Sequence, residues 1–235
     1  MPLRSRFFLV AGFLVVAAAC ARLGIWQLHR LQARRADNAV ALAARSAPTL
    51  VLNGRDLDST LVNRRVRVTG QYDHAHDIVL RGREYRGVPG VEIVSPLLPQ
   101  GSGAAVLVNR GFLPSPDAVT ADPLRVRETG VVQVEGIALA VDSGAGAPLR
   151  RRDQTTLRRL DLLALRGALP YPIAPLYVRQ IPDSALPRFP RRLEAPNLDD
   201  GPHRNYAIQW FAFALMALVF AGVIIRQKPD SRLGP

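Results

Sequence analysis

The chain has 235 residues and a net charge of +12, from 31 basic and 19 acidic side chains. Its length allows one domain with appended segments, and its arginines are scattered among acidic residues without any RNA- or DNA-binding motif, so we expect no nucleic-acid partner. The single cysteine, Cys20, lies in an apolar run, which excludes a disulfide and a cysteine-based copper chaperone.

Two apolar runs predict two transmembrane helices, over residues 7–27 and 203–225. The second run has no charged residue from Tyr206 to Ile225, and this is about the twenty residues that a helix needs to cross a bilayer core. We therefore expect both ends of the chain to contact the lipid bilayer.

The first apolar run has three interpretations. Its basic start, apolar core and Ala17–Cys20 segment resemble a cleaved signal, or even a lipoprotein signal. The apolar pattern continues to Trp26, however, with only Arg22 interrupting it, and an arginine near a helix end can extend its charge to the headgroups. We favour an uncleaved anchor.

Charge and tryptophan placement predict the topology. Residues 1–6 and 226–235 carry basic side chains, as cytoplasmic ends do, although arginines just after residue 27 make the charge count alone indecisive. The only two tryptophans, Trp26 and Trp210, fall at the helix ends that face the central region, where an aromatic belt would place them. We predict both termini in the cytoplasm and residues 28–202 across the membrane from them.

The central region is predicted to be rich in strands, because from residue 65 the apolar side chains alternate with a period of two. Before it, residues 27–45 are expected to extend the first helix. The expected strands are residues 65–72, 78–80, 91–94, 105–108, 130–140 and 175–181. Short helices are expected around 56–61 and over 157–169, with loops at 96–103 and 142–148. Residues 73–77 are expected to form a turn after which residues 78–80 return beside the strand at 65–72. The fold class is α+β: two transmembrane helices flank an antiparallel β-barrel-like or sandwich domain with one or two helices.

Three short motifs occur in order along the chain. Residues 24–30 (GIWQLHR) have the form G-x-W-Q-x-x-R, residues 108–114 (VNRGFLP) the form V-N-R-G-[FW]-[VIL]-P, and residues 203–210 (HRNYAIQW) the form H-x-x-Y-A-x-x-W. With the two flanking helices, the chain resembles the surfeit locus protein 1 family of cytochrome c oxidase assembly factors. The expected strands at 66–73 and 175–178 are also similar to that family.

The resemblance implies a location and a function. It implies a bacterial inner-membrane protein with a periplasmic central domain, which binds haem a transiently and assists its insertion into cytochrome c oxidase subunit I. Haem a synthase is a further implied partner. No enzymatic activity is implied, and the sequence has no G-x-S-x-G, P-loop or H-E-x-x-H motif. A cofactor-free scaffold for oxidase subunits and a membrane-anchored enzyme remain as alternatives.

His203 is the predicted metal ligand. The resemblance places a haem a ligand at this histidine, and a neutral imidazole can serve as an axial ligand to haem iron. Tyr206 and Trp210 follow on the same helix face, and Trp26 and Arg30 stand at the mouth of the first helix. These five residues form the predicted cofactor-binding site, which requires the two helices to touch. The alternative is an interfacial histidine that only hydrogen-bonds Tyr206 or a lipid headgroup.

The first motif also has a local interpretation. Trp26 and Arg30 are four residues apart on a helix and can stack as a cation–π pair. The alternative for Trp26 is simple anchoring at the membrane interface.

Two polar stretches of the central region have competing interpretations. Gly111 directly follows a strand and indicates a bulge or turn with positive φ; Asn109 and Arg110 are expected to brace it, or else to present a charge to a partner. His74 and His76 would face one way on a strand and could ligate a metal, but we favour a solvated turn.

Overall fold

The computed structural model describes residues 3–52, 57–100, 103–141, 149–151 and 154–227. It comprises two compact units, one made of Met1–Val40 with Leu198–Pro235 and the other of Ala41–Asn197. The expected loop at 142–148, the first residue of the expected short helix at 56–61, and the basic residues Lys228 and Arg232 lie outside the described residues.

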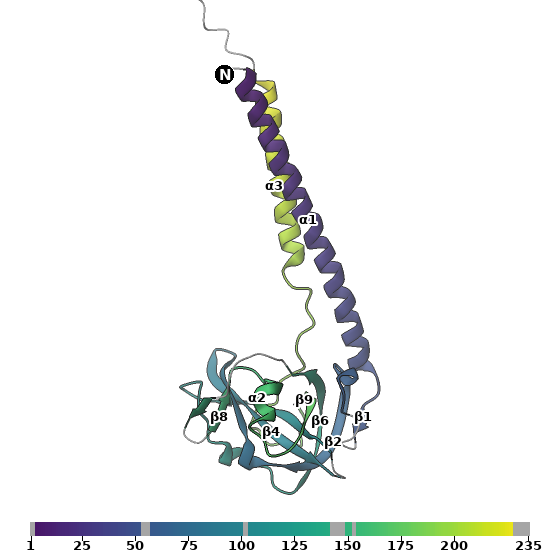
Figure 1. The fold of residues 1–235 in the computed structure, drawn as a ribbon, viewed down its shortest axis with the longest axis vertical. Coiled ribbons are helices and arrows are strands. Elements are labelled where there is room, and N and C mark those ends of the chain that lie inside the picture. Colours follow the sequence, from purple (N-terminus) through teal and green to yellow (C-terminus); the bar gives the residue numbers. More distant parts are fainter. Residues whose placement is uncertain (1–2, 53–56, 101–102, 142–148, 152–153, 228–235) are drawn as a thin grey trace, which may run out of the picture. The chain divides into compact units, whose positions relative to one another are not determined.

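Two long helices make up the first unit, α1 (Leu3–Ser46) and α3 (His203–Arg226) (Figure 1). Each has an 18-residue window with mean hydropathy of 2.2 or 2.3, of which only 17% is buried, unlike the core helix of a soluble protein. The chain is therefore a membrane protein, as predicted. The 44 residues of α1 extend over ~66 Å, so this one helix also includes the predicted extension beyond the membrane.

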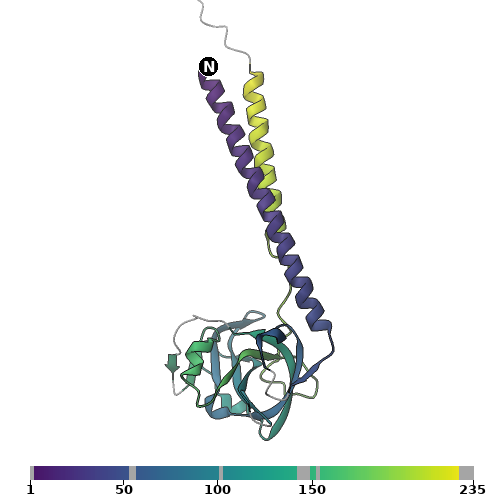
Figure 2. The same ribbon diagram turned by 45° about the vertical axis from the view of Figure 1, so that its right-hand side comes forward.

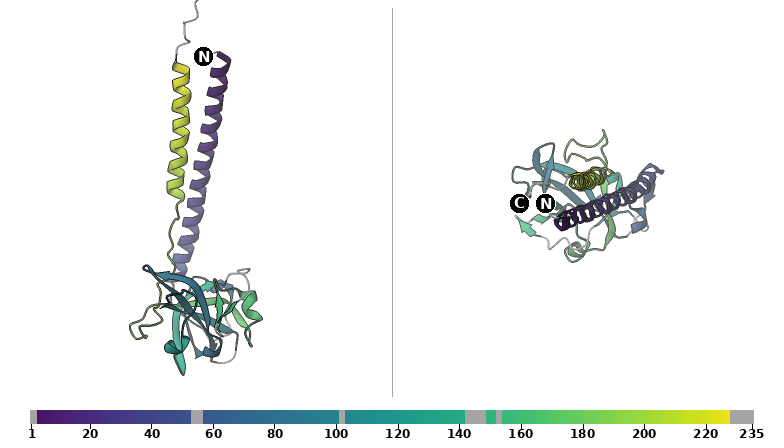
Figure 3. Two further views of the ribbon diagram at one scale, coloured as in Figure 1. Left: turned by 90° about the vertical axis from the view of Figure 1, so that its left-hand side faces the viewer. Right: turned by 90° about the horizontal axis from the view of Figure 1, so that it is seen from above.

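The two helices lie side by side (Figures 2 and 3), and most of their buried side chains are small. The buried positions of α1 recur every three or four residues: Ala17, Cys20, Gly24, Gln27 and Leu31. Those of α3 are alanines: Ala207, Ala214, Ala217 and Ala221. Between lipid-embedded helices such small residues allow the close approach on which van der Waals packing depends. At Gly24, a Cβ would lie 2.8 Å from the Phe211 ring, so this contact needs the glycine.

In its described residues the second unit is a β domain with three short 3₁₀ helices and one short α-helix. In chain order its elements are β1 (Leu50–Leu52), η1 (Ser59–Leu61), β2 (Arg65–Tyr72), η2 (His74–His76), β3 (Ile78–Tyr85), β4 (Val88–Pro99), β5 (Ala105–Pro114), η3 (Pro123–Val126), β6 (Val131–Ala140), β7 (Leu149–Arg151), β8 (Gln154–Leu157), α2 (Leu162–Arg166) and β9 (Ile173–Gln180). The strand order is β1-β2-β6-β9-β5-β4-β3-β8-β7.

The sheet closes on itself, because the end of β4 also pairs with the end of β2. The strands β2, β6, β9, β5 and β4 therefore form a ring, as the barrel-like prediction requires (Figure 1). Its interior is filled by branched apolar side chains that alternate along the strands, such as Val66, Val68, Val108 and Val178, all with 0% exposure. Among the described strands three pairings, β1–β2, β3–β8 and β5–β9, are parallel, so the domain is not purely antiparallel as expected.

Three local predictions need correction. The expected loop at 96–103 begins too early, because Pro96–Pro99 continue β4 and pair with β5 and β2. The strand at 78–80 does not return along β2; β3 pairs with β4 and β8 instead. The expected helix at 157–169 shrinks to α2, because Leu157 is buried in β8 opposite Leu80 and a helix starts only after the Asp161 cap.

Candidate functional site

One polar contact joins the two long helices at the central-region end of α3. Nδ1 of His203, the first residue of α3, lies 2.9 Å from Oε1 of Gln27 on α1. An amide oxygen only accepts, so Nδ1 is the donor, and in the neutral imidazole the lone pair is then on Nε2. We call Gly24, Gln27, Phe211 and His203 the helix junction. The contact between the helices, on which the predicted cofactor site depends, is present.

The chain that leads into α3 is held on α1 just before the junction. Nδ2 of Asn38 donates to the carbonyl oxygen of Asp199 over 2.9 Å, and Arg35 forms an ion pair with Asp200 at 2.8 Å. Gly201 then turns with a φ of +67°, and a Cβ there would lie 3.8 Å from Nε2 of His203. These contacts fix where α3 begins relative to α1, and the glycine leaves the Nε2 side of the imidazole uncrowded.

The structure brings together only part of the predicted five-residue site. His203 turns toward α1, but Tyr206 is 48% exposed and Trp26 is 51% exposed. Trp210 makes an edge-to-face contact with Phe213 within α3. Arg30 is exposed, and in the described part of the chain every cation–π contact lies in the β domain, so the expected Trp26–Arg30 stacking does not form.

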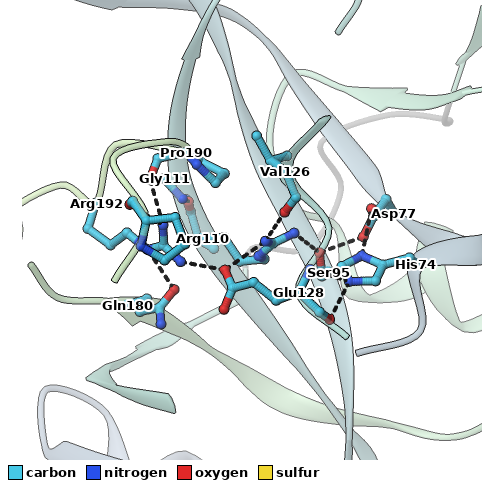
Figure 4. Close-up of polar contacts among 12 residues, drawn as sticks. His74, Asp77, Ser95, Arg110, Gly111, Val126, Glu128, Gln180, Pro190 and Arg192 are labelled. Carbon is cyan, nitrogen blue, oxygen red and sulfur yellow. Dashed lines mark hydrogen bonds and ion pairs between the residues drawn. The ribbon is translucent and has the colours of Figure 1, made fainter. Parts of the chain in front are cut away.

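A second polar constellation, the buried arginine cluster of Arg110, Glu128 and Arg192, lies inside the β domain (Figure 4). Both guanidinium groups donate to Oε1 of Glu128, over 2.7 Å from Arg110 and 2.6 Å from Arg192. The side chain of Arg110 is 0% exposed and that of Arg192 is 3% exposed. Arg110 also donates to the Val126 carbonyl and covers the Tyr72 ring at 4.9 Å. Arg110 therefore stabilises the interior and does not present its charge to a partner.

The cluster continues into the turn that sequence patterns suggested as a metal site or a solvated turn. Ser95 Oγ accepts from Arg110 and donates to Asp77, and His74 contacts Asp77 at 3.1 Å (Figure 4). His76 turns elsewhere and pairs with Asp73 at 2.6 Å, so the two histidines do not face one way.

Neither interpretation of the turn holds in full. Within the described residues no group of three or more His, Cys, Asp and Glu side chains could hold a metal ion. The side chains of His74 and Asp77 are only 11% and 4% exposed, so the turn is not simply solvated. Burial raises the pKa of Asp77 above its ordinary value, despite the opposing hydrogen bond from Ser95.

The V-N-R-G motif forms the expected bulge. Gly111 has a φ of +117°, and its N–H donates to Oδ1 of Asn109 over 3.0 Å, where the register of β4 and β5 shifts. Nδ2 of Asn109 donates to Glu92. The prediction that Asn109 braces this turn is confirmed. The bulge lets the backbones of Phe112 and Arg191 exchange two hydrogen bonds.

Glu128 makes the stability of the β domain sensitive to acid. Burial raises the pKa of this carboxyl, but the hydrogen bonds and charges of Arg110 and Arg192 more than offset that, and the pKa is lowered from 4.5. A carboxyl group whose pKa is lower in the folded than in the unfolded chain stabilises the folded state. This contribution is fully present at pH values above the unfolded-state pKa, and it is lost as the pH falls through the folded-state pKa.

We therefore expect the free energy of unfolding to decrease below about pH 4.5, with a slope of up to ~1.4 kcal/mol per pH unit from this one group. Urea titrations of wild type and Glu128→Gln between pH 3 and 7 would measure it. The variant should be less stable at pH 7 and flatter in acid; equal slopes would contradict the assignment.

Comparison with known proteins identifies the chain. A sequence model of the SURF1 family matches residues 14–215, most of its length. The chain belongs to the SURF1 family. The resemblance drawn from the three motifs is thereby confirmed, and all residues of the helix junction and the buried arginine cluster lie inside the matched range.

Individual proteins that are similar to the chain also carry SURF1 names. A SURF1-like protein of Monosiga brevicollis is 27% identical over 228 residues, which cover 90% of this chain and 85% of the relative. An uncharacterized SURF1-like protein of Mycobacterium tuberculosis is 29% identical over 180 residues, 73% of this chain and 64% of the relative. Surfeit locus protein 1 of Takifugu rubripes is 26% identical over 147 residues, 55% of this chain and 61% of the fish protein. The chain thus matches less than two thirds of the mycobacterial and fish proteins.

Membership in the SURF1 family gives the broad role, because this is a family of cytochrome oxidase assembly factors.

Sequence reasoning named His203 but missed its partner Gln27. The signal was available: Gln27 is the polar residue in the middle of the first motif, and it continues the three-and-four spacing of Ala17, Cys20 and Gly24. Glu128 and Arg192 had no comparable signal, since each lies in an irregular segment between elements.

Proposed function

We propose that this SURF1 protein assists the assembly of a haem-copper cytochrome c oxidase by holding haem a transiently and aiding its insertion into subunit I. In this proposal haem a synthase supplies the cargo, and the protein itself catalyses no reaction. The observation that carries the proposal is the hydrogen bond between His203 and Gln27 at the contact of the two membrane helices.

The residues of the helix junction fit an iron ligand. A histidine that ligates a metal commonly donates its other ring N–H to an acceptor, which fixes the tautomer and the ring orientation. Gln27 is such an acceptor for Nδ1, so Nε2 is the nitrogen that would bind iron. Haem a would supply the iron and an apolar macrocycle, and the exposed aromatic rings of Tyr206 and Trp26 offer apolar surface at the same helix ends. A single protein ligand suits a carrier, which must release its cargo.

We further propose a bacterial inner-membrane location with residues 28–202 in the periplasm and both termini in the cytoplasm. Arg4, Arg6 and Arg226 support this orientation, since all three lie at the helix ends away from the tryptophans. Arg6 also donates to the carbonyl oxygen of Ile224 over 3.1 Å, which keeps its charge at that end of the helix pair.

The deciding experiment is to purify the full chain from cells that synthesise haem a and to measure haem per protein from the visible spectrum. We expect His203→Ala to retain less than about a tenth of the wild-type haem, because the iron loses its ligand. His29→Ala is the matched control: His29 lies two residues from Gln27 in sequence but is exposed, and its loss should leave the haem content unchanged.

Unchanged haem in His203→Ala would remove this histidine as the ligand. A wild-type preparation without haem that still copurifies with oxidase subunit I would instead favour the cofactor-free scaffold. Both outcomes leave membership in the family untouched, because they concern only the cargo.

A further inference from the structure

A trough lined by arginines crosses one face of the β domain, far in sequence from the helix junction. It consists of two adjoining hollows of about 420 and 490 Å³ that share the side chains of Arg83 and Arg159. Arg179 adds a third guanidinium group to the first hollow, and Arg81 and Arg158 line the second. We call these two hollows the arginine trough.

The first hollow is lined by more positive than negative side chains. Its floor carries Glu92, whose side chain is 9% exposed and lies 3.7 Å from both Arg83 and Arg179. With Arg159 as the third cation and Glu92 as the only acid among its lining residues, this hollow has a net charge of +2. Glu92 makes its shortest contact with Nδ2 of Asn109, at 2.5 Å. Its distances to the two arginines are too long for direct hydrogen bonds, so Glu92 pairs with them only as a nearby charge.

The donors of these arginines are incompletely used. Within the described residues, the buried Nε atoms of Arg83 and Arg179 have no hydrogen-bond partner, and neither does that of Arg81. These Nε atoms are closed off from solvent, so a ligand would be held by the terminal nitrogens of the guanidinium groups, whose side chains are 30% exposed in Arg83 and 19% exposed in Arg179. Guanidinium groups match phosphate and carboxylate oxygens best.

Part of the remaining lining of the first hollow is apolar, beside the polar side chains of Asn109 and Tyr177. Leu80 and Leu160 are 3% and 5% exposed, and both line the cavity together with Leu139. In the second hollow the one acid, Asp117, is occupied by its own turn: it accepts hydrogen bonds from Ser115 and from Val119 and Thr120. The trough therefore combines an excess of guanidinium groups over carboxylates with some apolar lining, and Arg83 also donates to the carbonyl oxygen of Arg158 over 2.8 Å.

We propose that the arginine trough binds a ligand that ends in a phosphate monoester on an apolar body. The dianionic phosphate balances the +2 charge of the first hollow and supplies acceptors to Arg83, Arg159 and Arg179, while the apolar body contacts the leucines. The same chemistry occurs in a soluble alkyl phosphate and in the headgroup of phosphatidic acid. The proposal stands independently of haem binding, because no residue of the helix junction takes part.

The test is calorimetric titration of the full chain in an uncharged detergent with three probes: inorganic phosphate, hexyl phosphate and dihexanoyl phosphatidic acid. We expect saturable binding of hexyl phosphate with one site per chain. Arg159→Gln should weaken it about tenfold. Arg159 is the cleanest variant because it is exposed and makes no recorded hydrogen bond or ion pair among the described residues. Arg179→Gln should weaken binding at least as much. A thermal unfolding transition of this variant would show that the variant is folded.

Arg125→Gln controls for the overall charge of the chain, since Arg125 is 84% exposed and lines only a different hollow. Equal binding of all three probes would overturn the role given to the apolar body, because inorganic phosphate has none. Binding of phosphatidic acid that exceeds the other two would support a lipid headgroup. The proposal would be overturned if none of the probes bound saturably, or if Arg125→Gln weakened binding as much as Arg159→Gln.

Discussion

Replacing Arg110 by alanine is expected to destabilise the β domain by about 3–5 kcal/mol. The guanidinium group is wholly buried and contacts Glu128, Val126, Ser95 and the ring of Tyr72. Its removal opens a cavity and leaves the buried Val126 carbonyl oxygen without this donor, and both effects add. Glu128 keeps its contact with Arg192.

The measurement should report on the β domain alone. Both tryptophans lie in the long helices, so their fluorescence is unsuitable, whereas pulse proteolysis in urea follows cleavage of the domain directly. Arg125→Ala is the control for loss of an arginine: its ion pair with Asp122 is exposed and contributes at most about 0.5 kcal/mol. A similar loss in both variants would contradict the role given to Arg110.

A second variant separates charge from shape. Arg110→Met keeps most of the buried volume and leaves Glu128 paired with Arg192, so the cluster changes from two cations and one anion to a balanced pair. Replacing a buried ion by an apolar side chain of similar size is often much less destabilising than truncating it. We expect Arg110→Met to lose much less free energy of unfolding than Arg110→Ala. Equal losses would mean that the charge itself holds the cluster together.

The elements that sequence predicted well are those set by periodic apolar patterns. β2 alternates buried side chains with more exposed ones from Arg65 to Tyr72, and α1 and α3 each contain a long apolar run. The period of the pattern and the length of the apolar run therefore predict these elements. The closure of the barrel was beyond such reasoning. Pro96 has no N–H and reads as a loop residue, yet β4 continues through it because the ring needs a strand that pairs first with β3 and then with β2.

The helix junction was predictable only in part, because contact across helices depends on side-chain direction rather than on the motif itself. In the first motif Trp26 is the larger and more distinctive residue, but Trp26 is 51% exposed and its neighbour Gln27 contacts His203. The buried face of α1 was readable from its three-and-four spacing. The partners of Arg110 were not readable, since Glu128 and Arg192 meet it from segments without a repeating pattern.

Gly111→Ala is the second substitution with a large expected effect, a loss of about 3 kcal/mol or more in the free energy of unfolding. A φ of +117° is unfavourable for any residue with a Cβ. A Cβ at this position would also lie 2.1 Å from the carbonyl oxygen of Arg191, and this is a backbone atom that cannot turn aside. The two hydrogen bonds between Phe112 and Arg191 should therefore break.

Gly130→Ala separates the two causes. Gly130 has a φ of +81°, but nothing lies within 4 Å of the position that its Cβ would take, so its substitution carries the backbone penalty alone, about 1 kcal/mol. Urea denaturation followed by pulse proteolysis would give both losses. Limited proteolysis of the native variants would then show cleavage near Arg191 in Gly111→Ala only. Faster cleavage near Arg191 in Gly111→Ala would show that the V-N-R-G bulge holds residues 187–192 against β5. Equal losses of stability in both variants, with no cleavage there in either, would contradict that role.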